Sequence, residues 1–157
     1  MPNEKIYPVA KDIAERSHLN KELFSELYNQ SIGSPKEFWA EQAAELLSWH
    51  QPWETVTRSN FQTANTEWFA GAKLNVAFNC IDRHLEERGE QTAIIWEGDD
   101  PGDEKLITYN ELYKQVCKLS NALKERDIKK GDRVCIYMPM IPEAAYAMLA
   151  CARIGAI

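Results

Sequence analysis

The chain has 157 residues, of which 45% are hydrophobic and 27% are charged, and its seven glycines and seven prolines are dispersed. This composition is typical of one ordinary folded domain and excludes a disordered chain. Eighteen basic against 24 acidic residues give a net charge of −6, which disfavours nucleic acid or an anionic membrane as the main partner. The densest basic run, "KERDIKK" at 124–130, is broken by acids and is interpreted as a solvated helix end and turn.

No segment has the pattern of a secretory signal or a membrane span. The start, "MPNEKIYPVA", lacks a long apolar core, and two prolines, a glutamate and an arginine interrupt the apolar stretch 138–157. The sequence therefore predicts a soluble, cytoplasmic protein. The four cysteines show neither close pairing nor metal-type spacing, and three of them are expected to be small buried residues: Cys117, Cys135 and Cys151.

Residues 1–75 hold ten of the sixteen aromatic residues and show helical patterns without strand–helix alternation. One helix is expected near 20–30. The clearest helix start follows Ser34, which can cap; Pro35 suits the first helical position and Glu37 completes a capping box. We expect an aromatic-rich helical extension that anchors onto a larger body. A ligand pocket lined by these aromatics is the alternative.

Residues 76–157 change to alternating elements. A helix near 75–88 precedes the strand "TAIIW", the acidic hairpin loop "EGDDPGDEK" and the strand "LIT". Thr108 and Glu111 form a second capping box that opens a helix, which the turn "KKGD" ends.

The last elements complete the predicted fold class. "VCIYM" at 134–138 is apolar on both faces, which indicates an interior strand, and a helix from Pro142 leads to "AI", the start of another strand. The prediction is an α/β fold with right-handed crossovers and a parallel sheet. Because such a sheet should continue, we expect the domain to be incomplete at the C-terminus.

The sequence shows no catalytic, cofactor-binding or metal-binding residue. Its glycines never cluster into a phosphate loop, and its three histidines suggest no catalytic triad. Cys80 and His84, four apart, could share a metal ion, but a place on the apolar face of a helix is favoured. A hard cation at the acidic loop is the second metal hypothesis; the loop lacks calcium-loop spacing, so a solvated hairpin is favoured. Its acids are Asp99, Asp100, Asp103 and Glu104.

Four stretches carry a resemblance to a known family: "EWFAGAKLN", "NCIDRHLEERGEQTAIIWEGDD", "ITYNEL" and "KKGDRVCIYMPMIPEAAYAMLACARIGA". Together they resemble the N-terminal region of the AMP-forming acyl-CoA synthetases (the adenylate-forming family), and among these the acetyl-coenzyme A synthetases. The resemblance covers nearly the whole chain, and "WEGDD" is a specific part of it. One departure is visible, because Gly71-Ala72 stands before "LN" where the family commonly has two glycines.

The resemblance implies the reaction of an acetate–CoA ligase. Acetate attacks the α-phosphate of ATP–Mg to give acetyl-adenylate and pyrophosphate, and the thiol of CoA then displaces AMP. The family's phosphate loop, nucleotide pocket and catalytic lysine have no motif in this chain. We therefore expect ATP, Mg, CoA and acetate to bind a full-length enzyme, and the 157 residues alone to be inactive and to hold none of them.

The resemblance also implies a domain division. Residues 1–75 would be the helical extension, and residues 76–157 the start of the AMP-dependent synthetase domain. The isolated chain is expected to be marginally stable alone, or to self-associate through the open sheet edge and the C-terminal helix. Alternative interpretations are a propionyl- or acetoacetyl-CoA synthetase, or a non-catalytic α/β interaction module.

Overall fold

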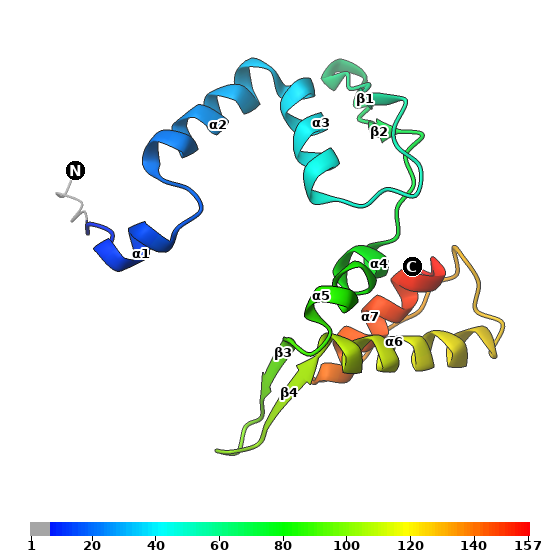
Figure 1. Cartoon of the computed structure of the whole chain (residues 1–157). Helices are drawn as coiled ribbons and strands as arrows, with labels where there is room; N and C mark the ends of the chain where they lie inside the picture. Colours follow the sequence, from blue (N-terminus) through cyan, green and yellow to red (C-terminus); the bar gives the residue numbers. More distant parts are fainter. Residues whose placement is uncertain (1–6) are drawn as a thin grey trace. The chain divides into compact units, whose positions relative to one another are not determined.

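The computed structural model describes residues 7–157, which form two compact units. The first unit ends at Leu46, and the second runs from Leu47 to Ile157 (Figure 1). The described part of the first unit is helical, and the second unit contains both helices and strands. A helical segment comes first, as predicted, but the first strand begins at Thr55, inside the predicted helical segment 1–75.

The first unit consists of three helices. The side chain of Asn20 caps the second helix by accepting a hydrogen bond from the backbone N–H of Leu23 at 2.8 Å. Ser34 joins the second helix to the third, since its N–H donates to the carbonyl of Gln30 at 2.8 Å and its carbonyl accepts from Phe38. The third helix begins at Pro35, as predicted, but the predicted capping box of Ser34 and Glu37 does not form among the described residues. The bounds are α1 Lys11–Arg16, α2 Lys21–Gly33 and α3 Pro35–Leu46.

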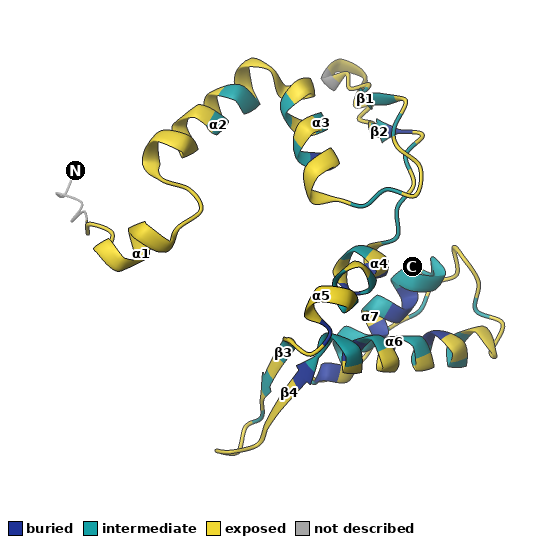
Figure 2. Ribbon diagram, viewed as in Figure 1, coloured by how far each residue is buried: buried dark blue, intermediate teal, exposed yellow. Residues whose placement is uncertain are grey.

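These helices leave most of their apolar side chains exposed. Within residues 7–46, Ala43 alone is buried, and Figure 2 shows the three helices largely in the colour of exposed residues. The rings of Phe24 and Tyr28 stack at 6.1 Å on α2, yet both side chains are more than half exposed. The first unit therefore buries too little apolar surface to form a core of its own.

The second unit opens with a short antiparallel pair, β1 (Thr55–Thr57) and β2 (Trp68–Ala70). Beside it lies an aromatic cluster in which the ring centroid of Trp53 is 5.3 Å from that of Trp49 and 5.1 Å from that of Phe69. The aromatic side chains of this region therefore pack against one another. A short 3₁₀ turn, η1 (Phe61–Thr63), lies between the two strands.

The Gly71-Ala72 departure is compatible with the local backbone. Gly71 has φ +79°, a left-handed conformation that favours glycine, whereas Ala72 is not among the described residues with positive φ. Ala72 donates its N–H to the carbonyl of Phe69 at 3.0 Å, which closes the turn. A second glycine is therefore not required at this position.

The helix predicted near 75–88 is broken into three short pieces, so the prediction of one continuous helix is wrong. Ile81 has φ −126° and ψ −67°, which ends the first piece, and its side chain is fully buried. The interruption of the helix places the Ile81 side chain in the core. The pieces are α4 (Val76–Cys80), η2 (Asp82–His84) and α5 (Leu85–Arg88).

An antiparallel hairpin follows, formed by β3 (Thr92–Glu97) and β4 (Glu104–Thr108). Its exposed tip is the acidic loop, as predicted. The Thr108–Glu111 capping box is also confirmed: the Thr108 hydroxyl accepts from the Glu111 N–H at 3.2 Å, and the Glu111 carboxylate accepts from the Thr108 N–H at 2.9 Å. This box opens the long helix α6 (Tyr109–Lys124).

The core lies where α6 packs against α7 (Pro142–Ile154) and against the base of the hairpin. Ser120 is buried between the two helices and donates to the carbonyl of Ala150 at 3.4 Å. Trp96 of β3 donates its indole N–H to the carbonyl of Met140 at 2.7 Å and so fixes the segment before α7. The buried cluster consists of Ile81, Ile107, Leu112, Val116 and Ala150.

The interior strand predicted at 134–138 does not form in this structure. The segment belongs to neither sheet, and Tyr137 is 100% exposed. Both sheets in residues 7–157 are two-stranded and antiparallel. One parallel feature is present: Ile157 donates to Asp132 at 2.7 Å and accepts from Val134 at 2.8 Å, which is the bonding pattern of parallel neighbours. The crossover through α7 therefore matches the prediction, whereas the sheet does not.

Candidate functional site

Arg153, near the end of α7, forms a largely buried ion pair in the second unit. Its guanidinium forms two hydrogen bonds with the carboxylate of Asp82, one of them 3.2 Å between Nη1 and Oδ1. The two side chains are only 22% and 19% exposed. Arg153 also lies 5.2 Å from the ring centroid of Tyr113. A planar guanidinium suits both partners, since it forks onto a carboxylate and stacks on an aromatic face.

Asn75 ties the same two regions together from the backbone side. Its amide nitrogen donates to the carbonyls of Ala152 and Arg153 at 3.3 and 3.0 Å, which caps the end of α7. Its amide oxygen accepts from the N–H of Phe78 at 3.1 Å, which caps the start of α4. The end of α7 and the start of α4 are thus joined by one side chain and one ion pair.

A first hollow of about 500 Å³ opens on one side of Arg153. Trp49 and Phe78 supply its apolar walls. Asn79 holds this part of the chain in place, because its side chain accepts from the N–H of Ser48 at 2.8 Å and donates to the Ser48 carbonyl at 2.9 Å. The remaining lining residues are Ser48, His50, Lys73, Leu74, Asn75 and Asp82.

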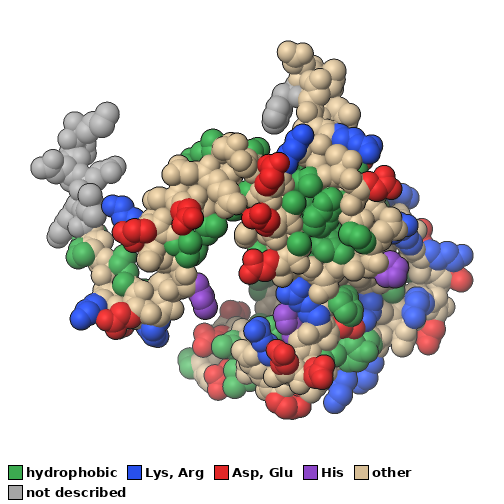
Figure 3. Space-filling view, turned by 45° about the horizontal axis from the view of Figure 1, so that its top comes forward, with side chains coloured by type: hydrophobic (Ala, Val, Ile, Leu, Met, Phe, Trp, Pro, Cys, Tyr) green, Lys and Arg blue, Asp and Glu red, His purple; other side chains and the backbone are tan. Residues whose placement is uncertain are grey.

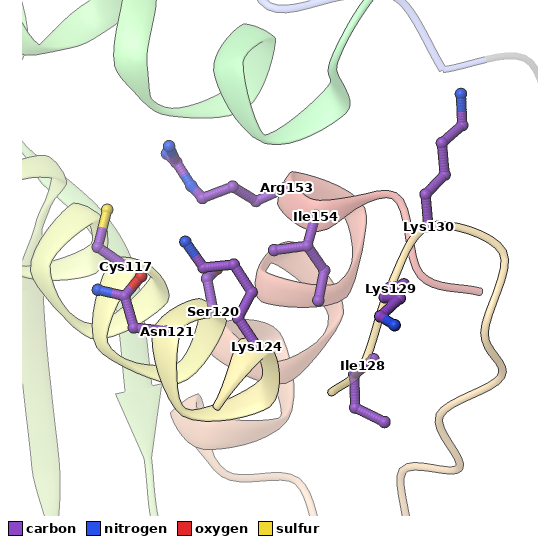
Figure 4. A pocket seen from close by; sticks show the side chains of 9 residues that line it. All are labelled: Cys117, Ser120, Asn121, Lys124, Ile128, Lys129, Lys130, Arg153 and Ile154. Carbon is purple, nitrogen blue, oxygen red and sulfur yellow. The ribbon is translucent and has the colours of Figure 1, made fainter. Parts of the chain in front are cut away.

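A second hollow of about 650 Å³ is also lined in part by Arg153. Figure 4 shows its lining side chains coming from α6, from the loop after α6 and from α7. Four of the nine lining residues are basic and none is acidic. The lining consists of Cys117, Ser120, Asn121, Lys124, Ile128, Lys129, Lys130, Arg153 and Ile154.

Three groups near the core have shifted pKa values. A hydrogen bond with the Cys117 side chain, followed by the charges of Cys117 and Asp82, raises the pKa of Tyr113. Burial raises the pKa of Tyr146 and of Cys151. A thiol with a raised pKa is a poor nucleophile at neutral pH, so Cys151 is a packing residue.

The Cys80–His84 metal hypothesis gains no support. Cys80 is exposed, so its predicted place on an apolar face is wrong, and the His84 ring lies 5.7 Å from that of Tyr109. Arg83 donates to the Nε2 of His84 at 3.3 Å. Within residues 7–157, no group of three or more His, Cys, Asp or Glu side chains could hold a metal ion.

The acidic loop, which is part of the described residues, likewise contains no group of side chains that could hold a metal ion. Asp99, Asp100 and Asp103 lie around the exposed hairpin tip, where Gly98 and Asp103 are bonded through their backbones. The expected solvated loop is confirmed. Among the cysteines expected to be buried, Cys151 is buried and Cys117 is half-buried, whereas Cys135 is exposed and that prediction is wrong.

The Asp82–Arg153 pair was missed by the reasoning from sequence. One signal could have found half of it, because "AMLACARIGA" places a single arginine among apolar residues, and a buried charge requires a partner. The identity of the partner depends on the break at Ile81, which the periodicity does not show.

Comparisons with known proteins agree with this architecture. Residues 24–80 match the family described as acetyl-coenzyme A synthetase N-terminus, and residues 81–157 match the family of AMP-binding enzymes. Together the two matches cover residues 24–157. The resemblance found in the sequence is therefore confirmed.

Proteins named acetyl-coenzyme A synthetase match the whole chain or nearly all of it. This chain is 56% identical over 157 residues to an acetyl-coenzyme A synthetase of Alkalilimnicola ehrlichii. It is 59% identical over 151 residues to acetyl-coenzyme A synthetase 2 of Pseudomonas putida. These matches span all and 96% of this chain, but only 24% and 23% of the relatives. The chain therefore spans about a quarter of the length of the relatives that it matches.

A solved structure shows the same fold. Acetoacetyl-CoA synthetase from Streptomyces lividans matches with a TM-score of 0.77 and 27% sequence identity, over 92% of this chain and 22% of that chain. The predicted α/β class is confirmed by this match. In the part of the chain that the structure describes, no helix is long and apolar enough to cross a membrane.

Proposed function

We propose that this chain acts as the N-terminal part of an acetate–CoA ligase. The observation that carries the proposal is its 56% identity, along its whole length, to a protein named acetyl-coenzyme A synthetase. The proposed reaction converts acetate, ATP and CoA into acetyl-CoA, AMP and pyrophosphate through acetyl-adenylate.

ATP, Mg and CoA are the proposed cofactors of the full-length enzyme. When bound, ATP–Mg supplies the activated phosphorus that acetate attacks, and CoA supplies the thiol that accepts the acetyl group. We assign no residue of this chain to contact with these groups, because its seven glycines form no phosphate-binding loop. The contribution of this chain is structural: it provides the α6–α7 layer and the hairpin on which a larger α/β domain rests.

We propose the domain division at residue 75, with a helical extension before it and the start of the synthetase domain at 76–157. The family boundary at 80/81 and the boundary of the compact units at 46/47 lie on either side of it. A cytoplasmic location and small-molecule substrates, without nucleic acid or membrane partners, complete the proposal. The net charge of −6 supports the exclusion of nucleic acid.

Acetoacetate is the second candidate substrate, because the structural match is an acetoacetyl-CoA synthetase. Its 27% identity is far below the 56% of the acetyl-coenzyme A synthetase relative, which favours acetate.

A chimera tests the proposal. This chain would replace the matching 157 residues of the Alkalilimnicola ehrlichii relative, and acyl-dependent pyrophosphate release would be measured with acetate, propionate and acetoacetate. We expect acetate to be used with the highest kcat/KM. A folded chimera without acetate activity would contradict the proposal, because this chain would then fail to replace the matching segment of an acetyl-coenzyme A synthetase.

A further inference from the structure

Three lysines line the second hollow. Lys124 ends α6, and Lys129 and Lys130 follow in the loop (Figure 4). None of the three ammonium groups makes a hydrogen bond or an ion pair within residues 7–157. The lysines of the basic run thus all line one hollow, and Figure 4 shows the Lys130 side chain extending away from those of Lys124 and Lys129.

Helix capping does not account for these lysines. Lysine near a helix C-terminus ordinarily compensates carbonyl groups that lack donors. At the end of α6, however, the carbonyls of residues 121–124 accept from the N–H groups of residues 125–128 and from the Arg126 guanidinium, at 2.9–3.1 Å. At the end of α7, Asn75 and the backbone N–H groups of residues 155 and 156 serve the same purpose.

The charge balance of the hollow is positive. Each helix C-terminus contributes about half a negative charge, so α6 and α7 together offset about one of the three lysine charges. Asp82 already compensates Arg153, and no carboxylate lines the cavity. The side-chain amide of Asn121 adds a further hydrogen-bond donor at the wall. Beside the hollow, the carboxylate of Asp132 accepts from the backbone N–H of Lys129 at 2.7 Å and offsets one further charge. The hollow therefore presents an excess of about one positive charge.

We infer that this hollow binds a small phosphate-bearing anion, either inorganic phosphate or a phosphate monoester, through Lys124, Lys129 and Lys130. Phosphate offers two negative charges and several acceptor oxygens to flexible ammonium groups. The volume of about 650 Å³ accommodates a small monoester. The inference goes beyond the proposed function and stands on this chain's own side chains, so a failure of the acetate assay leaves it unaffected.

Titration of the ¹⁵N-labelled 157-residue chain with sodium phosphate, followed by amide chemical shifts, tests the inference. Ionic strength is held constant with sodium chloride, since exposed charges are screened by salt. We expect saturable shifts at Asn121, Lys129 and Lys130. Substitution of all three lysines by glutamine (K124Q, K129Q, K130Q) is expected to weaken phosphate binding about tenfold or more.

A matched control removes the same charge elsewhere. Lys36, Lys114 and Lys118 are exposed and do not line the hollow, so K36Q, K114Q and K118Q together should leave the affinity unchanged. Equal weakening in both triple variants, or shifts that grow linearly with phosphate in the unsubstituted chain, would overturn the inference. All six lysines are exposed, so both variants should fold; the circular dichroism spectrum verifies this, and the single change K124Q replaces the triple variant if it does not.

Glycerol 3-phosphate distinguishes the two sources of phosphate. Tighter binding of glycerol 3-phosphate than of inorganic phosphate would assign the site to a monoester, and the reverse order would assign it to the free ion. Glycerol at the same concentrations is the uncharged control, and equal shifts with glycerol would refute the role of the lysines.

Discussion

Arg153 and Asp82, which lie 71 residues apart in the chain, form a two-pronged ion pair that joins the end of α7 to the turn after α4. Both side chains are about four-fifths buried. An ion pair in such a place stabilises little relative to an apolar pair, but the removal of one partner leaves a desolvated charge. The pair therefore fixes how the chain folds back on itself.

The first prediction is that Asp82→Asn lowers the free energy of unfolding by about 2–4 kcal/mol, because Arg153 then remains largely buried without its counter-charge. Urea unfolding measures the change. The exposed pair of Asp12 and Arg16 supplies the control, since Asp12→Asn should cost less than about 0.5 kcal/mol. Equal effects of the two substitutions would show that the Asp82–Arg153 pair has no special structural role.

The second prediction concerns the capping box at the start of α6. Thr108→Ala removes the hydroxyl that accepts from the N–H of Glu111, and should lower the free energy of unfolding by about 1 kcal/mol. Thr108→Ser keeps the hydroxyl and should restore most of this loss. If serine and alanine proved equally destabilising in urea, the contribution of Thr108 would come from its methyl group instead of the cap.

The third prediction contrasts two glycines at helix ends. Gly155 has φ +78°, and an added Cβ would lie 2.9 Å from the Cγ of Lys130, so Gly155→Ala should destabilise the second unit by about 1–2 kcal/mol. Gly33 ends α2 with nothing within 4 Å of an added Cβ. Gly33→Ala should therefore increase helicity, by up to about 1 kcal/mol of helix stability.

Circular dichroism at 222 nm and urea unfolding measure the two glycine effects. A rise in helical signal with Gly33→Ala and a lower urea midpoint with Gly155→Ala are expected. The same sign for both substitutions would mean that backbone conformation does not decide these positions.

The sequence predicted the elements whose cause is local. The Thr108–Glu111 box, the start of α3 at Pro35 and the start of α7 at Pro142 depend on neighbouring residues, and all three are confirmed. Features that depend on distant contacts were not predicted. Ile81 breaks its helix because the core takes its side chain, and the Asp82–Arg153 pair exists only after that break.

The candidate site follows the same rule. The run "KERDIKK" is visible in the sequence, but nothing in its spacing shows that Lys124, Lys129 and Lys130 share a cavity with Arg153. The cavity arises where the loop after α6 returns to the end of α7, as in the bond from Gly131 N–H to the Gly155 carbonyl at 2.9 Å. The predicted interior strand at 134–138 was read from its apolar composition, and composition alone does not supply a strand neighbour.

The fourth prediction is that the isolated 157-residue chain does not adenylate acetate. The chain has no phosphate loop in its sequence to hold ATP for attack by acetate. Acetate, ATP and magnesium would be mixed with the purified chain, and pyrophosphate release compared with a heat-treated sample. Release above this background would require catalytic groups among these residues. It would refute the expectation that the chain contains no catalytic residue.

The last prediction is that the isolated chain self-associates through the segment 134–138. The N–H and C=O groups of residues 135–138 have no hydrogen-bond partner within the described chain, and Tyr137 is fully exposed beside the exposed Met138. The segment carries no charge to oppose the approach of a second copy. Unpaired backbone groups in an apolar segment can pair with a second copy as a strand.

Sedimentation velocity over a range of concentrations measures this association. Tyr137→Lys places a charge on the segment without loss of packing, because the side chain touches nothing in the monomer, and should shift the chain toward the monomer. Tyr28→Lys, on the exposed face of α2, is the control and should leave association through 134–138 unchanged. If the chain is instead a cooperatively folded monomer at every concentration measured, residues 134–138 need no partner and the prediction is wrong.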